Sequence, residues 1–159
     1  MTSFSQFDPD ILGNTPKRMQ EFYAYWCKIR GDRIMPRRID FDPMDIPHHL
    51  PGILLIDVVS RTDTGERSFR YRVVGQWEVL SRNANPTGLW VEEGAYHNAK
   101  ERALANYKLV RDKKEPLFRK IKNVNIKGVP VEEMALFVPL SKDGTTVSQI
   151  LVYSEQRAP

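Results

Sequence analysis

The last third of the chain contains three strand-length segments rich in apolar residues and separated only by short connections, at about residues 117–126, 131–140 and 146–153. Segments of this length and composition predict β-strands, and the pair Asp143-Gly144 is typical of a tight turn between the last two. Strands joined by such short connections pair in the antiparallel sense. The sequence therefore predicts that an antiparallel sheet dominates this part of the fold.

Two more strands are predicted earlier, at residues 53–60 and 68–75, with a turn at residues 62–66 between them. The first is a short apolar run with β-branched residues, which is typical of a buried strand. In the second, Phe69, Tyr71 and Val73 alternate with other residues and are expected to share one face. These two strands are expected to form an antiparallel hairpin.

A helix is predicted over residues 15–31, with Thr15 as its N-cap, Pro16 at the first helical position and Gly31 as its stop. Short helical pieces follow at residues 76–93, and Pro116 ends a longer helix. The order of helix, two strands, helical middle and three strands predicts an α+β class. We expect residues 1–14 to form an N-terminal tail and residues 15–159 a single domain.

Composition narrows the functional classes. The net charge is +4 and the pI is near 9.2, with the basic residues concentrated at residues 28–38 and 108–127. Neither stretch falls in a known nucleic-acid-binding pattern, so nucleic acid is not an expected partner. Cys27 is the only cysteine, which fits a reducing compartment. There is no apolar run of membrane-spanning length and no basic-then-apolar start. We therefore expect a cytoplasmic protein with no membrane partner.

Several short motifs, in the same order, resemble a PAS-like family that is common in alphaproteobacteria, often as stand-alone proteins. The resemblance covers about residues 20–153 and implies a five-stranded sheet in the order 2-1-5-4-3, covered by helices. It also implies a sensory role without catalysis. The matching motifs are Tyr25-Trp26, Arg30-Gly31, Met35-Pro36-Arg37, the run DPMDIPHHLPGILLIDV, the run FRYRVVG and the tripeptide Pro86-Thr87-Gly88.

The resemblance places a mostly apolar pocket between the inner face of the sheet and the helical middle. Trp77 and Trp90 are expected to be buried in or beside it. Bulky Gln76 and Trp77 stand where the family has small polar residues, which leaves open whether they fill the pocket. No cofactor is assigned, and a small apolar ligand is expected. The candidate ligand-binding residues are Leu55, Tyr71, Val73, Trp77, Leu80, Leu89, Trp90, Tyr96, Leu136 and Ile150.

The sequence predicts no metal site and no catalytic residue. His48 and His49 are adjacent, so their side chains diverge, and His97 is a single histidine at the start of the long helix. Cys27 lies in the first helix rather than in the motif that a flavin photosensor needs. The alternative reading is a small isomerase or hydrolase that uses Asp57 or Glu78 as its base near Tyr71 or His97.

The first helix also suggests an oligomer. Aromatic side chains are enriched at the centres of protein interfaces, and Tyr25 and Cys27 add apolar character off the main stripe. The sequence therefore predicts a homodimer through the N-terminal helix and a separate signalling protein as the output partner. The apolar stripe is formed by Met19, Phe22, Tyr23, Trp26 and Ile29.

Overall fold

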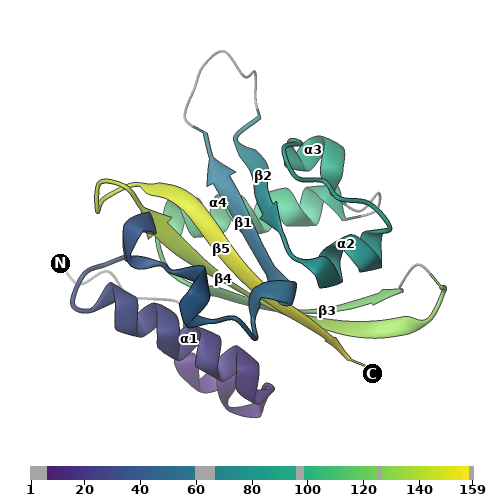
Figure 1. The fold of residues 1–159 in the computed structure, drawn as a ribbon, viewed down its shortest axis with the longest axis horizontal. Helices are drawn as coiled ribbons and strands as arrows, with labels where there is room; N and C mark the ends of the chain where they lie inside the picture. The colour runs from purple at the N-terminus through teal and green to yellow at the C-terminus, as the bar shows by residue number, and fades with distance from the viewer. Residues whose placement is uncertain (1–6, 60–66, 96–98, 125–126, 158–159) are drawn as a thin grey trace.

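The computed structural model describes residues 7–59, 67–95, 99–124 and 127–157. Its centre is a five-stranded antiparallel sheet in the order β2-β1-β5-β4-β3 (Figure 1), which confirms the predicted fold class and strand order. The turn predicted at residues 62–66 lies outside the described residues. The strands are β1 Ile53–Val58, β2 Phe69–Val74, β3 Leu117–Val124, β4 Pro130–Ser141 and β5 Val147–Arg157.

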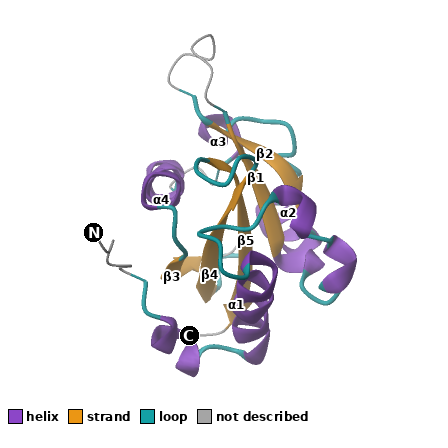
Figure 2. Cartoon of the chain, turned by 90° about the vertical axis from the view of Figure 1, so that its left-hand side faces the viewer, coloured by secondary structure: helices purple, strands orange, loops and turns teal. Residues whose placement is uncertain are grey.

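Helices cover both faces of the sheet. Figure 2 shows α1 (Lys17–Arg30) on one side and α4 (Lys100–Lys113) on the other, and a separate apolar core lies on each side. None of the helices in the described residues is long and apolar enough to cross a membrane. The remaining helices are α2 Gln76–Arg82, α3 Val91–Gly94 and short 3₁₀ helices at Pro9–Asn14, Arg38–Asp40, Pro43–Asp45 and Leu50–Gly52.

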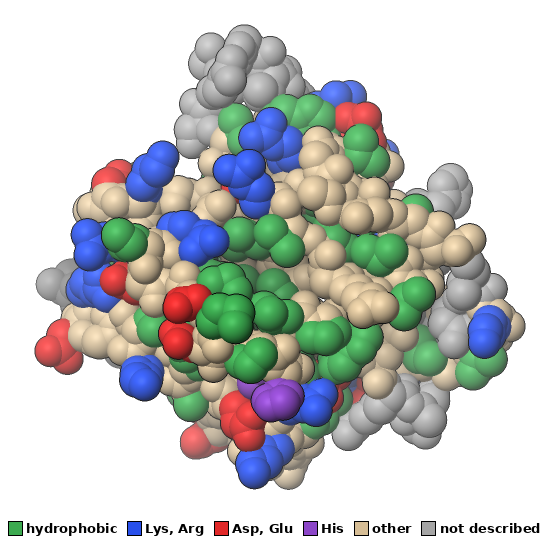
Figure 3. All heavy atoms as spheres, in the orientation of Figure 1, with side chains coloured by type: hydrophobic (Ala, Val, Ile, Leu, Met, Phe, Trp, Pro, Cys, Tyr) green, Lys and Arg blue, Asp and Glu red, His purple; other side chains and the backbone are tan. Residues whose placement is uncertain are grey.

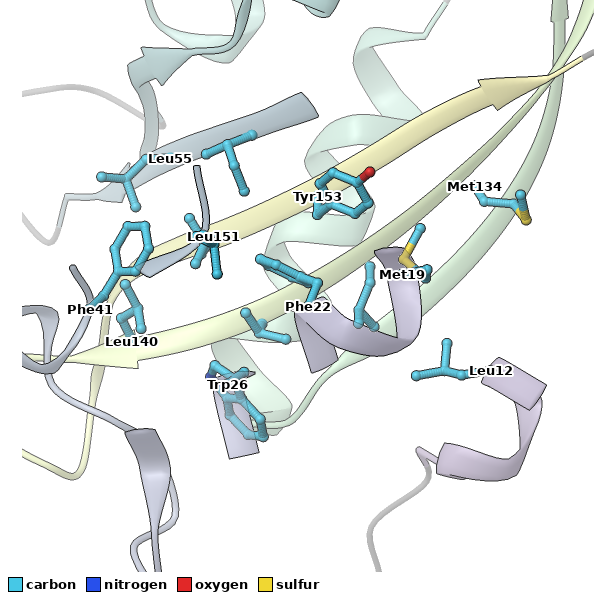
Figure 4. Close-up of a cluster of buried hydrophobic side chains, with 14 residues drawn as sticks. Leu12, Met19, Phe22, Trp26, Phe41, Leu55, Met134, Leu140, Leu151 and Tyr153 are labelled. Atoms are coloured by element: carbon cyan, nitrogen blue, oxygen red, sulfur yellow. The ribbon is translucent and has the colours of Figure 1, made fainter. Parts of the chain in front are cut away.

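The core between α1 and the sheet consists of aromatic and long apolar side chains (Figure 4). Met19, Phe22 and Trp26 are at most 1% exposed. The indole N–H of Trp26 donates to the carbonyl oxygen of Pro139 at 3.0 Å, so its polar group is satisfied inside the core. The aromatic stripe of α1 is therefore covered by the sheet of the same chain.

The ends of α1 differ in how well the sequence predicts them. Pro16 occupies the N-cap position, while the Thr15 hydroxyl donates to the carbonyl oxygen of Leu12 at 2.6 Å and closes the preceding 3₁₀ helix. Gly31 ends α1 with φ 61, as predicted, because glycine adopts positive φ without strain. The segment expected to be a tail thus contributes Leu12 to the core.

A bulge in β2 changes which face its later side chains occupy. Leu55 pairs with Val73 and Ile56 pairs with Tyr71, so Arg72 is an extra residue between the two pairs. One extra residue shifts the alternation of side chains by one position. Tyr71 therefore faces α4 as expected, whereas Val73 lies on the α1 face and is 47% exposed. The prediction that the two share a face is wrong.

Candidate functional site

A small cavity lies between the sheet and α4, where the family resemblance places a pocket. Its volume is about 70 Å³. Since a water molecule occupies roughly 30 Å³ of liquid, the cavity has room for about two waters. Half of its lining is polar, which differs from the mostly apolar pocket expected. The polar lining residues are Glu78, Arg82, Arg102, Asn106, Tyr107, Glu133 and Ser154.

A buried ion pair forms the wall of this cavity on the side of α2. Arg82 Nε donates to Glu78 Oε2 at 3.2 Å, and the two side chains are 9% and 5% exposed. The Ser154 hydroxyl donates to Glu78 Oε1 at 2.9 Å. Arg82 Nη1 donates to the Tyr71 hydroxyl at 3.1 Å and to the carbonyl oxygen of Gly94 at 2.8 Å. These bonds offset the cost of desolvating two charges and tie α2 to β5, β2 and α3.

Two tyrosines lie next to the ion pair. The guanidinium of Arg82 lies 5.0 Å from the centre of the Tyr71 ring. Burial raises the pKa of Tyr71 and outweighs the opposite effect of Arg82, and burial also raises the pKa of Tyr107 well above its ordinary value. Both phenols are therefore protonated at neutral pH, when each can donate or accept a hydrogen bond.

A wider cleft opens on the other side of Glu78 and Ser154. Its volume is about 450 Å³, which falls in the range of small-molecule sites. Trp77 and Leu80 line it and are 39% and 64% exposed, so the cleft has an apolar wall. Glu78 and Ser154 line both the cleft and the cavity, and their hydrogen bond therefore separates the two. The other lining residues are Arg18, Ser81, Lys127, Glu155 and Gln156.

Gly52 lies against both α2 and β5. A Cβ atom at this position would lie 2.7 Å from the carbonyl oxygen of Ser154, 2.9 Å from Tyr153 Cε1 and 3.0 Å from Trp77 Cε3. Only glycine permits so close an approach without a shift of the backbone. The indole that walls the cleft thus packs next to the backbone of β5.

Neighbouring residues of β5 connect this site to α1. Ser154 faces the cavity, and Tyr153 faces the opposite side because strand side chains alternate. The Tyr153 ring lies 5.5 Å from the Phe22 ring (Figure 4) and 4.9 Å from the His49 ring, measured between centroids. His49 Nε2 donates to the carbonyl oxygen of Arg18 at 2.8 Å. Ser154 at the cavity and Tyr153 against α1 are therefore neighbours on a single strand.

The structure brings together only part of the predicted ligand-binding set. Tyr71 is buried beside the cavity and contacts its ion pair, and Ile150 is buried in the same core. Trp77 and Leu80 line the cleft instead of the cavity. The expected burial of Trp77 is wrong, because α2 turns this side chain toward the cleft. Gln76 is exposed, so neither of the two bulky residues fills the cavity.

The predicted placement of Leu55, Leu136 and Val73 beside the pocket is wrong. Leu55 pairs with Leu151, and Leu136 pairs with Tyr153. Directly opposite residues of antiparallel strands share a face, so both leucines belong to the core under α1. The bulge described above places Val73 on that face as well. These three side chains are therefore separated from the cavity by the sheet itself.

The remaining predicted residues lie at the margin or outside the described part of the chain. Leu89 is 43% exposed. Trp90 is half-buried, and the guanidinium of Arg70 lies 5.6 Å from its ring centre. Tyr96 and His97 lie outside the described residues. Ligand contact by the residues at the cleft and the cavity stays a prediction.

The two carboxylates considered as catalytic bases lie on opposite faces of the sheet. Both oxygens of Glu78 accept hydrogen bonds in the cavity wall. Asp57 lies on the α1 face, where its Oδ1 accepts a hydrogen bond from Gln149 Nε2 at 2.8 Å and its Oδ2 lies 3.6 Å from two arginines of β2. Asp57 is therefore not brought together with Tyr71, which faces α4.

Two residues of the site, Arg82 and Ser154, are not predicted from the sequence. The separation of Glu78 and Arg82 by four positions is a signal for an ion pair on a helix, although it does not indicate burial. Ser154 follows directly after the predicted end of the last strand at residue 153, whereas β5 continues to Arg157. Its position facing the cavity depends on that extra length.

Known proteins show which family shares this arrangement. A family model described as a PAS domain matches residues 14–153. A light-oxygen-voltage domain, from a structure that concerns a flavin analogue, is similar with a TM-score of 0.51 and 11% identity over 72% of this chain and 83% of that chain. No curated protein matches the chain.

Two structures of VqmA are also similar. VqmA bound to DPO has a TM-score of 0.53 and 10% identity over 72% of this chain and 56% of that chain. The Vibrio cholerae VqmA dimer without its target DNA has a TM-score of 0.53 and 8% identity over 72% of this chain and 50% of that chain. At these identities the structures show a common fold and nothing finer. The family model spans far more than half of the sequence, and this chain belongs to the PAS domain family, whose members are sensory and regulatory domains.

Proposed function

We propose that this PAS domain is a non-catalytic sensory module that binds a small molecule at the cleft and signals through a change in the docking of α1. The hydrogen bond between Ser154 and Glu78 carries the proposal. It separates the cleft from the cavity, and its serine is adjacent to Tyr153, which packs against α1. A ligand that breaks this bond therefore acts at the residue next to the α1 contact.

The walls of the cleft suggest the chemistry of the ligand. An apolar ring or chain would pack on Trp77 and Leu80, while a hydroxyl or amine group would replace the Ser154 hydroxyl as a donor to Glu78. The cavity of about 70 Å³ can accept such a polar group but not a whole ligand. The apolar ligand expected from the sequence is thereby refined to an amphipathic one.

The signal would be a shift between two states of the domain. In one state Ser154 and Glu78 are bonded, and in the other a ligand separates them. The ligand changes the balance only if it binds the second state more tightly. Movement of β5 at Ser154 would alter the contact of Tyr153 with Phe22, which is part of the α1 core.

The output is proposed to be contact with a separate signalling protein, and the homodimer through the N-terminal helix stays a proposal. The buried stripe of α1 is not available to a partner, because Met19, Phe22 and Trp26 pack on the sheet. Tyr25 is half-buried and its hydroxyl donates to Asp45 Oδ2 at 2.9 Å. A second protomer would instead meet the exposed side of α1, which carries Gln20, Ala24 and Lys28.

The finer family assignment and the location of the protein are also proposals. Motifs such as Met35-Pro36-Arg37 favour the stand-alone group that is common in alphaproteobacteria. The single cysteine, Cys27, favours a cytoplasmic location. The enzymatic alternative receives less support, because Glu78 is held by two hydrogen bonds and Asp57 lies on the other face of the sheet.

Nuclear magnetic resonance titration with small aromatic alcohols and amines tests the proposed function. We expect shifts to cluster at the Trp77 indole N–H and the Ser154 amide, and to disappear in a Leu80→Ser and Trp77→Ala double variant. A Trp90→Ala variant is the matched control and should bind as the parent does. Shifts confined to other regions, or chemical turnover that depends on Glu78, would overturn the proposal.

A further inference from the structure

A second groove lies on the face of the sheet that α1 covers in part. Its volume is about 700 Å³, and it runs over β1, β2 and β5. Figure 3 shows this face, where Lys and Arg side chains gather in the region of β1 and β2. The charged side chains among its described lining residues are Arg38, Arg70, Arg72, Lys142 and Asp57, so the groove carries an excess of three positive charges.

Asp57 holds two of these arginines in place. Its Oδ2 lies 3.6 Å from Arg70 Nη2 and 3.6 Å from Arg72 Nε. The carboxylate side chain is 14% exposed, whereas the arginine side chains are 43% and 63% exposed. A guanidinium has five N–H donors, and each arginine approaches Asp57 through one nitrogen. Among the described residues, neither arginine has a further hydrogen bond, so its other donors can pair with a ligand in the groove.

Gln149 adds an acceptor to the same groove. Its Nε2 donates to Asp57 Oδ1 at 2.8 Å, which fixes the orientation of the amide. Its Oε1 is buried and has no hydrogen-bond partner among the described residues. A buried acceptor without a partner is unfavourable, and an N–H group of a ligand would satisfy it.

We propose that this groove binds an acidic, extended segment of a partner protein. Carboxylates of the segment would pair with Arg72 and Lys142, and a backbone N–H would reach Gln149 Oε1. Val73, which is 47% exposed, offers an apolar contact between the charges. The proposal rests on the proposed function only in that a sensory domain needs a partner to receive its signal.

Nucleic acid fits the groove less well. Its phosphodiester backbone has no N–H group for Gln149 Oε1, and it carries a negative charge at every nucleotide, whereas a peptide can place an uncharged residue beside the Asp57 carboxylate. Non-specific nucleic-acid binding also relies on many basic residues along a continuous track. An acidic peptide combines N–H donors with carboxylates and with apolar side chains, so it matches all three features of the groove.

Fluorescence anisotropy with a short fluorescein-labelled peptide of alternating glutamate and valine tests whether the groove binds an acidic segment. We expect the full chain to bind it, with weaker binding at higher salt. The double variant Arg72→Glu and Lys142→Glu should weaken binding by about tenfold or more. The matched control, Lys108→Glu and Lys113→Glu on α4, has the same net charge and should change binding by about twofold at most.

Two comparisons show whether the groove prefers an acidic peptide to nucleic acid and whether it acts independently of the cleft. A single-stranded oligonucleotide of the same charge should bind more weakly than the peptide, and tighter binding that is lost in the groove variant would overturn the proposal in favour of nucleic acid. The proposal is also overturned if the peptide does not bind, or if both double variants bind it equally. A Trp77→Ala variant should bind the peptide as the parent does, so failure of the cleft proposal would not be mistaken for failure of this one.

Discussion

The hydroxyl of Ser154 donates to Glu78 at 2.9 Å and joins two residues that are 76 positions apart in the chain. One belongs to the end of β5 and the other to α2. Both are buried, and both lie between the cavity and the cleft. The bond therefore joins the helix that walls the cleft to the strand that contacts α1.

Replacing Ser154 with alanine should lower the free energy of unfolding by about 1–3 kcal/mol, because Glu78 Oε1 would then be buried without this donor. Urea denaturation measures the change. The control is Ser81→Ala, which removes an exposed hydrogen bond from Gln156 Nε2 at 3.1 Å and should cost about 0.5 kcal/mol or less. Equal losses in the two variants would contradict a special role for Ser154.

Substitutions of Glu78 and Arg82 should be strongly coupled in their effects on the free energy of unfolding. Arg82→Met alone should cost about 3–5 kcal/mol, because it leaves a buried carboxylate without its counter-charge. The double variant Glu78→Leu and Arg82→Met should lose much less than the sum of the two single losses, because it leaves no unpaired charge. Denaturation of the four proteins gives the coupling energy. Additive losses would mean that the pair does not act as a unit.

Gly52 should not tolerate a side chain. Gly52→Ala places a Cβ within 3.0 Å of atoms in Trp77, Tyr153 and Ser154, so we expect a loss of about 1–3 kcal/mol and a change in tryptophan fluorescence. Gly13→Ala is the matched control, because no atom lies within 4 Å of its added Cβ. A Gly52→Ala protein as stable as the control would show that α2 can move away from β5 at little cost.

The turn between β4 and β5 should make stability depend on pH. The backbone N–H groups of Thr146 and Thr145 donate to Asp143 and hold the pKa of its carboxyl below the ordinary value of 3.8. A lowered pKa means that the carboxylate stabilises the fold above about pH 3.8. That contribution is lost as the pH falls through the folded-state pKa.

Asp143→Asn should therefore lower the thermal midpoint at neutral pH, and the difference from the parent should shrink as the pH falls below 3.8. Thermal melts followed by circular dichroism across this range measure the difference. A difference that stays constant with pH would show that the side-chain shape, rather than the charge of Asp143, stabilises the turn.

Element order was predictable because turns and periodicity are local properties of the sequence. Gly31 and the pair Asp143-Gly144 mark a helix end and a turn, and the structure confirms both. The end of α4 differs from the prediction, because the helix ends at Lys113, where Lys114 adopts φ 58, before the predicted stop at Pro116. Propensity alone does not show where a lysine will take the left-handed conformation.

The faces of the strands were harder to predict. β1 is apolar on both sides, because α1 covers one face of the sheet and α4 the other, so no alternation shows which face Leu55 occupies. The bulge at Arg72 reverses the alternation of β2 and has no marker such as glycine. The candidate site was therefore only half predictable, since which residues meet there depends on strand register and on the length of β5.

Hydrogen–deuterium exchange of α1 in the Ser154→Ala variant tests the proposed link between the cleft and α1 most directly. We expect faster exchange in residues 19–26 than in the parent, while β3 and β4 keep their protection, because Tyr153 connects Ser154 to Phe22. Ser81→Ala should leave α1 unchanged. If α1 exchanges at the parental rate in Ser154→Ala, or if all strands lose protection equally, the site does not act on α1 and the account is wrong.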